Sequence, residues 1–171
     1  MRKIALIDFE ASCLPDYGNS YPIEVALAPV DGESRYWLIR PTPLWETWEW
    51  SDEAESMHCI SHLLLAEEGK PPAQVVTELA AAAEGYEVYA DSDLDAYWLE
   101  ILAHGAKAKL PFTIRHVGQL MGELGVTRAQ VDAALDHAQE LLPREHVARD
   151  DALRLAAAIR LLIEQQGGQA D

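Results

Sequence analysis

A continuous apolar run near the amino terminus constrains the fold of this chain more than any other feature. Residues Lys3 to Phe9 read Lys-Ile-Ala-Leu-Ile-Asp-Phe. Such a run is typical of a buried strand in the middle of a sheet, because a strand with one solvated face alternates between apolar and polar residues. We therefore expect residues 3–9 to form the central strand of a sheet that is flanked by helices.

The following segments predict the rest of an α/β fold. Two β-rich runs, 23–30 and 34–39, flank Asp31-Gly32, a dipeptide typical of short hairpin turns, so the first three strands are predicted to form an antiparallel meander. Further strands are predicted at 86–90 and 112–117, with helices from Pro71-Pro72 to just before Gly85, at 95–103, from Thr127 to Leu142 and at 150–165. These elements predict a single domain over residues 1–166 with a frayed tail at 167–171.

Charge and hydropathy exclude several classes of function. The 171 residues include 13 Lys and Arg against 29 Asp and Glu, a net charge of −16, so the chain has no broad basic face for long duplex DNA. Its apolar runs are shorter than the ~20 residues of a membrane span or the ~7–15-residue core of a secretory signal, which predicts a cytoplasmic protein without a membrane partner. Cys13 and Cys59 are then expected to be free thiols.

The first strand ends with two carboxylates. Asp8 and Glu10 are two residues apart, so they project from the same face of a strand. Two neighbouring carboxylates beside a core repel each other, and a bound divalent cation keeps both ionised. The alternative is that the strand simply ends at the surface and that water solvates both acids.

Two further segments place acids where α/β proteins bind ligands. Asp95 lies at a helix start after the predicted fourth strand, with Asp91 as the alternative candidate nearby. Asp151 lies in the first turn of the last helix, near the positive end of the helix dipole, and His146 precedes that helix. Ordinary helix capping by Asp150 and Asp151 is the alternative interpretation of this last segment.

Together these segments resemble the motifs of the DEDDh family of 3′–5′ exonucleases, which includes RNase T, oligoribonuclease and polymerase proofreading subunits. The matching motifs are Asp8-Phe9-Glu10, Asp95 at a helix start, and His146-x-Ala-x-x-Asp151-Ala. The segment Met57-His58-Cys59-Ile60-Ser61 also resembles the family's His-Gly-Ile segment, with Cys in place of Gly. The resemblance implies a ribonuclease H-like fold, with a mixed five-stranded sheet in which parallel strands follow the antiparallel meander.

The resemblance also implies a mechanism. It predicts hydrolysis of the phosphodiester at a 3′ end with two Mg²⁺ or Mn²⁺ ions. Asp8 would contact both ions, Glu10 and Asp151 would hold the ion at the attacking water, and Asp95 would hold the ion at the leaving group. His146 would accept the proton of the water, a role suited to a side chain that titrates near neutral pH.

The distribution of basic residues predicts a short substrate. Eight of the thirteen Lys and Arg lie from residue 107 onward, which leaves few side chains to contact phosphates. We expect a single-stranded 3′ end of RNA or DNA, contacted by Phe9, His58 and Arg149, with few phosphate contacts. The other candidate phosphate contacts are Lys107, Lys109, Arg115 and Arg144. One of Trp45, Trp48 and Trp50 would stack on a base, or the three would instead pack as a flap over the sheet.

Two other functions are compatible with parts of this pattern. The fold of a nuclease can also serve as an interaction module that binds metal or a protein without efficient hydrolysis, but such a module has no need of all five predicted catalytic residues. His58 and His62 have the spacing of a zinc helix, but Cys59 follows His58 where that motif has a glutamate. We therefore do not expect zinc.

Overall fold

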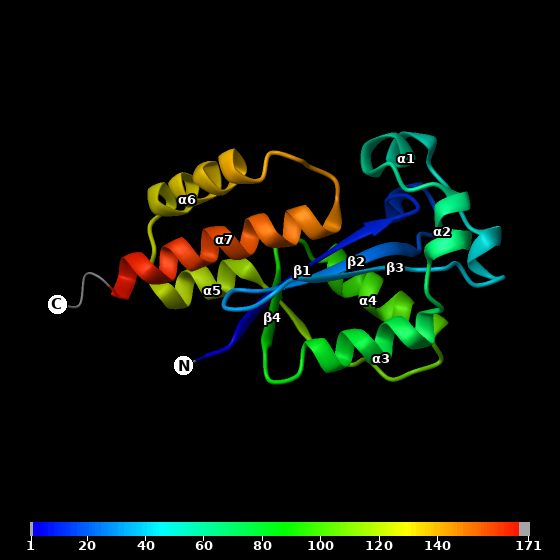
Figure 1. Ribbon diagram of the computed structural model, residues 1–171, viewed down its shortest axis with the longest axis horizontal. Coiled ribbons are helices and arrows are strands. Elements are labelled where there is room, and N and C mark those ends of the chain that lie inside the picture. The colour runs from blue at the N-terminus through cyan, green and yellow to red at the C-terminus, as the bar shows by residue number, and fades with distance from the viewer. Residues whose placement is uncertain (1, 168–171) are drawn as a thin grey trace.

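A computed structural model describes residues 2–167 and shows a mixed sheet of five strands between helices (Figure 1). The strands are β1 (Ile4–Ala11), β2 (Pro22–Pro29), β3 (Arg35–Leu38), β4 (Glu87–Ala90) and β5 (Ile114–His116), in the order β3-β2-β1-β4-β5. β1, β2 and β3 pair antiparallel, whereas β1 pairs parallel with β4 and β4 with β5. The antiparallel meander and the parallel strands that follow it confirm the predicted sheet.

Helices cover both faces of the sheet (Figure 1). They are α1 (Asp52–His58), α2 (His62–Glu68), α3 (Pro72–Ala82), α4 (Leu94–Gly105), α5 (Val117–Leu124), α6 (Arg128–Leu141) and α7 (Ala148–Gly167), with short 3₁₀ helices at Pro15–Tyr17 and Trp45–Thr47. α3 and α4 pack on one face, and α5, α6 and α7 belong to the core on the other face. No helix within residues 2–167 is long and apolar enough to cross a membrane.

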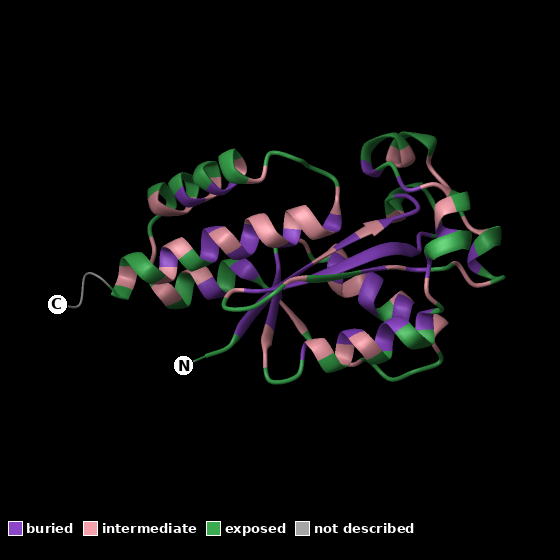
Figure 2. Ribbon diagram, viewed as in Figure 1, coloured by how far each residue is buried: buried purple, intermediate pink, exposed green. Residues whose placement is uncertain are grey.

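The alternation of side chains along β1 explains the two cores. Ala5, Ile7 and Phe9 belong to the core beneath α3 and α4, whereas Ile4 and Leu6 belong to the core beneath α7. Because both faces are covered, the first four residues of β1 are buried (Figure 2). The row of Ile4 and Leu6 continues toward the carboxyl end of β1 with two carboxylates, so these lie on the α7 side.

Three segments differ from the sequence prediction. The strand predicted at 112–117 is shorter, and α5, which was not predicted, begins directly after it with the His116 side chain accepting a hydrogen bond from Gly118 N at 3.0 Å. The tryptophan-rich segment, whose irregular pattern predicts a loop with one short helix, leads into two helices; α1 ends at His58 and α2 begins at His62, so the two histidines do not share a helix. Gly167 belongs to α7 rather than to a tail, and 168–171 lie outside the described residues.

Packing around Trp45 favours the interpretation of the tryptophans as a flap. Trp45 is 1% exposed and stacks on Tyr21 with 5.7 Å between the ring centroids. Trp48 and Trp50 are partly buried against the same core. Gly105, the last residue of α4, faces the Trp45 ring, and a Cβ there would lie 2.3 Å from Trp45 Cζ2. The segment that contains Trp45 therefore packs against the end of α4.

We expect Gly105→Ala to destabilise the protein, because the added methyl group displaces either the Trp45 ring or the end of α4. Overpacking of this kind costs about 1–3 kcal/mol, which lowers Tm by roughly 2–12 °C in a chain of this length. Gly122→Ala is the matched control, since a Cβ at this helical glycine meets no atom within 4 Å. Thermal unfolding of both variants measures the difference, and equal Tm values would contradict the packing of Trp45 against α4.

Candidate active site

The amino end of α7 brings its acids over β1. α7 packs on β1 and β2, and its first residue, Ala148, donates its backbone N–H to Glu24 Oε2 at 3.0 Å. Glu24 is 4% exposed and lies opposite Glu10 in the register of β1 and β2. Glu24 was not among the residues predicted from the sequence, although a single charged residue inside an otherwise uncharged strand is a detectable signal.

Four predicted carboxylates meet at the carboxyl end of β1. One oxygen each from Asp8, Glu10 and Asp151 lie within 4.8 Å of one another. A second group of oxygens, from Asp8, Asp91 and Asp95, also lies within 4.8 Å. Asp8 belongs to both groups, and Asp91 joins Asp95 instead of replacing it. The arrangement offers two adjoining sets of oxygen ligands that share one carboxylate.

Asp95 carries a buried oxygen without a partner. Its side chain is 2% exposed, and Oδ1 accepts a hydrogen bond from Phe9 N at 3.0 Å. Oδ2 is buried and has no hydrogen-bond partner among the described residues. A buried carboxylate oxygen without a partner is costly, and a cation removes this cost. The donor set therefore fits a hard divalent cation such as Mg²⁺ or Mn²⁺, which prefers oxygen ligands.

Burial and mutual repulsion raise the pKa values of these acids. Burial raises the pKa of Glu10 to about 8, with Asp151 as the next contribution. Burial, followed by repulsion from Asp95 and Glu10, raises the pKa of Asp8 well above its ordinary value. The pKa of Asp95 is raised by burial and then by Asp91. In the absence of a cation, the cluster therefore holds protons at neutral pH.

Two histidines, His58 and His146, are close enough to influence each other and lie outside both carboxylate groups. His146 is exposed, has a φ of 58° and lies two residues before α7; it belongs to neither carboxylate group. His58 is 4% exposed, its Nδ1 accepts a hydrogen bond from Ile60 N at 3.0 Å, and its buried Nε2 has no partner in the described part of the chain. Burial lowers the pKa of His58 to about 4, with a smaller effect from His146. His58 is thus neutral at pH 7 with an Nε2–H available to donate.

Cys59 stands at the position where the family motif that this segment resembles has a glycine. Cys59 ends α1 in the left-handed conformation with a φ of 60°, a conformation that glycine adopts most easily. A glycine at this position would suit the backbone, and this chain forms the left-handed turn with a cysteine.

The structure places the Phe9 side chain away from the carboxylates beside which a base contact was predicted. Its side chain is 4% exposed and packs in the core beneath α3 and α4, on the face opposite Asp8 and Glu10. Arg149, in contrast, lies two residues before Asp151 in the first turn of α7; its guanidinium is 5.3 Å from the centre of the Tyr36 ring and its Nε is 3.2 Å from Asp150 Oδ1. Arg149 and His58 line one cavity of about 220 Å³.

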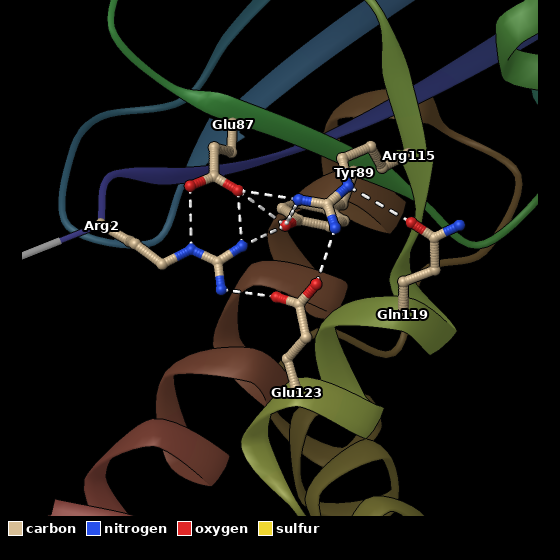
Figure 3. Close-up of polar contacts among 6 residues, drawn as sticks. All are labelled: Arg2, Glu87, Tyr89, Arg115, Gln119 and Glu123. Carbon is tan, nitrogen blue, oxygen red and sulfur yellow. Dashed lines mark hydrogen bonds and ion pairs between the residues drawn. The ribbon is translucent and has the colours of Figure 1, made fainter.

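Arg115, one of the candidate phosphate contacts, is engaged elsewhere. Figure 3 shows its guanidinium between Glu87 and Glu123, at 3.0 and 2.7 Å, with the Tyr89 hydroxyl at 2.7 Å. Arg2 binds the same two glutamates from the other side. Both guanidinium groups are therefore matched by carboxylates, and the network joins the amino-terminal segment to β4, β5 and α5.

Comparison with solved structures identifies the class of fold. The chain has the fold of DEDDh-type 3′-exonucleases, with which it shares the mixed five-stranded sheet. It superposes on the nuclease domain of 3′hExo, a DEDDh family member bound to rAMP, with a TM-score of 0.72 and 19% identity over 95% of this chain and 92% of that domain. The fold implied by the sequence motifs is thus confirmed.

Other structural neighbours are exonucleases that are longer than this chain. E. coli exonuclease I in complex with a dA16 oligonucleotide matches with a TM-score of 0.68 and 10% identity, over 99% of this chain and 42% of that one. Full-length 3′-exonuclease matches with a TM-score of 0.71 and 20% identity, over 95% of this chain and 60% of that one. No protein-family model and no curated protein sequence matches this chain.

Proposed function

We propose that this protein is a metal-dependent 3′–5′ exonuclease that acts on short single-stranded nucleic acid. The observation that carries the proposal is the pair of carboxylate groups that share Asp8, one of which contains the buried and unpartnered Oδ2 of Asp95. The fold supports it, because the structural neighbours are exonucleases, one bound to rAMP and another to a DNA oligonucleotide.

The carboxylates would hold two Mg²⁺ or Mn²⁺ ions. Asp8 would contact both, Glu10 and Asp151 would hold one, and Asp95 with Asp91 would hold the other. When bound, the ions supply positive charge at the scissile phosphate and the leaving oxygen. Arg154, which lines the same cavity as Asp8 and Asp151, is already paired with Asp151.

The histidines and Arg149 would act on the substrate directly. His146 would accept the proton of the attacking water, and its exposed position before α7 suits a group that meets the substrate. Neutral His58 would donate its free Nε2–H to an oxygen of the terminal nucleotide. Arg149 would contact a phosphate next to the cavity that it shares with His58.

Degradation of end-labelled oligonucleotides tests the proposal. We expect products shortened one nucleotide at a time from the 3′ end of single-stranded RNA or DNA, in Mn²⁺ or Mg²⁺ and not in EDTA. A label at the 5′ end separates this ladder from endonuclease products. Metal binding without any cleavage of either nucleic acid would contradict the proposal and favour an interaction module, the alternative that the sequence left open.

The scarcity of basic side chains predicts a weak dependence of binding on salt. Two or three phosphate contacts imply a log–log slope of only about −1.5 to −2, since single strands contribute about −0.7 per contact. Fluorescence anisotropy in Ca²⁺, in place of the catalytic ion, measures binding across a salt series. We expect a short oligonucleotide to bind about as well as a long one. A slope steeper than about −4 would reveal an extended basic track and contradict the short-substrate proposal.

A further inference from the structure

Arg154 connects the carboxylate cluster to the loop that carries His146. It lies one turn after Asp151 on α7, and its side chain is 14% exposed. Its Nη1 forms an ion pair with Asp151 Oδ1, its Nε donates to Leu142 O at 2.9 Å, and its Nη2 donates to Arg144 O. One guanidinium therefore joins a proposed metal ligand to two carbonyl groups of the loop between α6 and α7.

Before His146, this loop is also contacted by Gln139, whose Nε2 donates to Pro143 O at 3.4 Å and to Glu145 Oε1 at 2.9 Å. Residues 142–147 lie outside helices and strands, and His146 is held at a φ of 58°, a conformation that is unfavourable for a residue with a Cβ. On the far side of His146, Val147 N donates to Asp151 Oδ2 at 3.3 Å. The carboxylate of Asp151 and the guanidinium of Arg154 thus hold the backbone on both sides of His146.

We propose that Arg154 is a positioning residue that sets the place of the His146 imidazole relative to the carboxylate cluster. The proposal rests on the function proposed above, because it assigns His146 the proton transfer. Arg154 also lines the cavity of about 410 Å³ that is lined by Asp8, Asp91 and Asp151, so the side chain that contacts the loop also borders the carboxylate cluster.

The shape of the guanidinium is essential to this role. Its planar arrangement of donors reaches three acceptors in different directions at once, whereas a lysine ammonium is a point charge on a flexible stem. Arg154→Lys therefore keeps the charge next to Asp151 but loses the simultaneous contacts with Leu142 O and Arg144 O. A displacement of the catalytic base by about 1 Å lowers the rate by about 10²-fold.

The test compares Arg154→Gln and Arg154→Lys with Arg160→Gln. Arg160 is a matched control, since it lies on the same helix and its Nε donates to the carbonyl of Val30, on the β2–β3 turn, at 2.7 Å. Both Arg154 variants should lower kcat by about 10–10²-fold, with KM and the metal-induced rise of Tm retained. Arg160→Gln should leave kcat unchanged. A fall of kcat in Arg154→Gln that Arg154→Lys restores would show that charge alone acts, and would overturn the proposal.

A double-mutant cycle shows whether Arg154 acts through His146. In the His146→Ala background, Arg154→Gln should cause no further loss of kcat, because the group that it positions is absent. If the loss of kcat in the double variant equals the product of the losses in the two single variants, Arg154 acts independently of His146 and the proposal is overturned.

Hydrogen exchange gives a readout that does not depend on activity. The amides of Leu142 and Val147 should exchange at least about tenfold faster in Arg154→Gln, while amides in the middle of α7 keep their protection. A wild-type protein without nuclease activity would overturn the proposed function. Unchanged exchange and unchanged kcat in Arg154→Gln would overturn only the role of Arg154.

Discussion

Asp8→Asn is expected to abolish both metal binding and nuclease activity. Asp8 is the carboxylate common to both groups of oxygen ligands, so its loss weakens both proposed ion sites at once. Removal of several kcal/mol of charge stabilisation corresponds to a loss of activity of about 10³-fold or more. In the wild type, metal at 100 times its Kd should add about 2.7 kcal/mol of stability, and this gain should be absent in the variant.

The same substitution should have the opposite effect on the metal-free protein. Burial, followed by repulsion from Asp95 and Glu10, makes the ionised form of Asp8 unfavourable in the folded protein, and a neutral amide removes this cost. We expect Asp8→Asn to unfold at a higher temperature than the wild type in EDTA at pH 8, and at a lower temperature in Mn²⁺. Calorimetry in both buffers measures this reversal, which general damage to the fold would not produce.

The metal-induced stabilisation should increase with pH. The pKa of Glu10 is raised to about 8 in the folded protein, whereas a free glutamate titrates near 4.5. Between these values the folded state binds a proton that the unfolded state lacks, so the stability of the metal-free protein falls as the pH rises. A cation must displace this proton, which weakens binding at low pH. The rise of Tm on adding Mn²⁺ should therefore be small at pH 5 and large at pH 8.

Asp93→Asn serves as the control for this series. Asp93 is exposed at the start of α4, close in sequence to the cluster, and belongs to neither group of ligands. Its substitution should leave the metal-induced rise of Tm and the activity within about twofold of the wild type. An Asp8→Asn variant with the full rise of Tm would contradict the assigned site.

His146→Ala is expected to lower kcat by about 10²–10⁴-fold and to leave metal affinity nearly intact. The reason is that His146 lies outside both carboxylate groups, on an exposed loop. Asp151→Ala, in contrast, should weaken metal binding and activity together. Steady-state kinetics and titration with Mn²⁺, followed by the rise of Tm, separate the two residues.

The pH profile adds a second criterion for His146. If His146 accepts the proton, the pH dependence of the wild-type rate should differ from that of His146→Ala, which lacks the accepting group. His137→Ala is a suitable control, because His137 is exposed on α6 and is not part of the proposed site. Equal loss of metal affinity in His146→Ala and Asp151→Ala would instead make His146 a ligand or a structural residue.

Local rules made most of the carboxylate site predictable. The shared face of Asp8 and Glu10 follows from the two-residue period of a strand. The position of Asp151 near the helix dipole follows from its place in a first helical turn. The same period also determines that Phe9 faces away from Asp8 and Glu10, so its burial was accessible from the sequence. The resemblance to a nuclease motif favoured a base contact there, and the period of the strand was the better guide.

Contacts between distant segments were not predictable in this way. Arg115 was a candidate for phosphate binding because of its charge alone, but the fold places it against Glu87 and Glu123. Asp91 was kept as an alternative to Asp95, and the structure places both beside Asp8. α5 was missed because its eight residues follow a strand without a break, with only a histidine cap to mark its start.

The sequence by itself determined most of the order of strands and helices, because strand alternation, helix caps and hairpin turns depend on residues a few positions apart. Its resemblance to the family motifs indicated which four carboxylates form one site. Only the tertiary structure decided which charges meet. The hydrogen bond between Glu24 and the start of α7 arises where α7 packs on the sheet, as do the contacts of Arg154 with the His146 loop. The unpartnered Oδ2 of Asp95 arises where α4 packs on the sheet. Electrostatic interactions act between groups that are near in space, and that nearness is a property of the packed core.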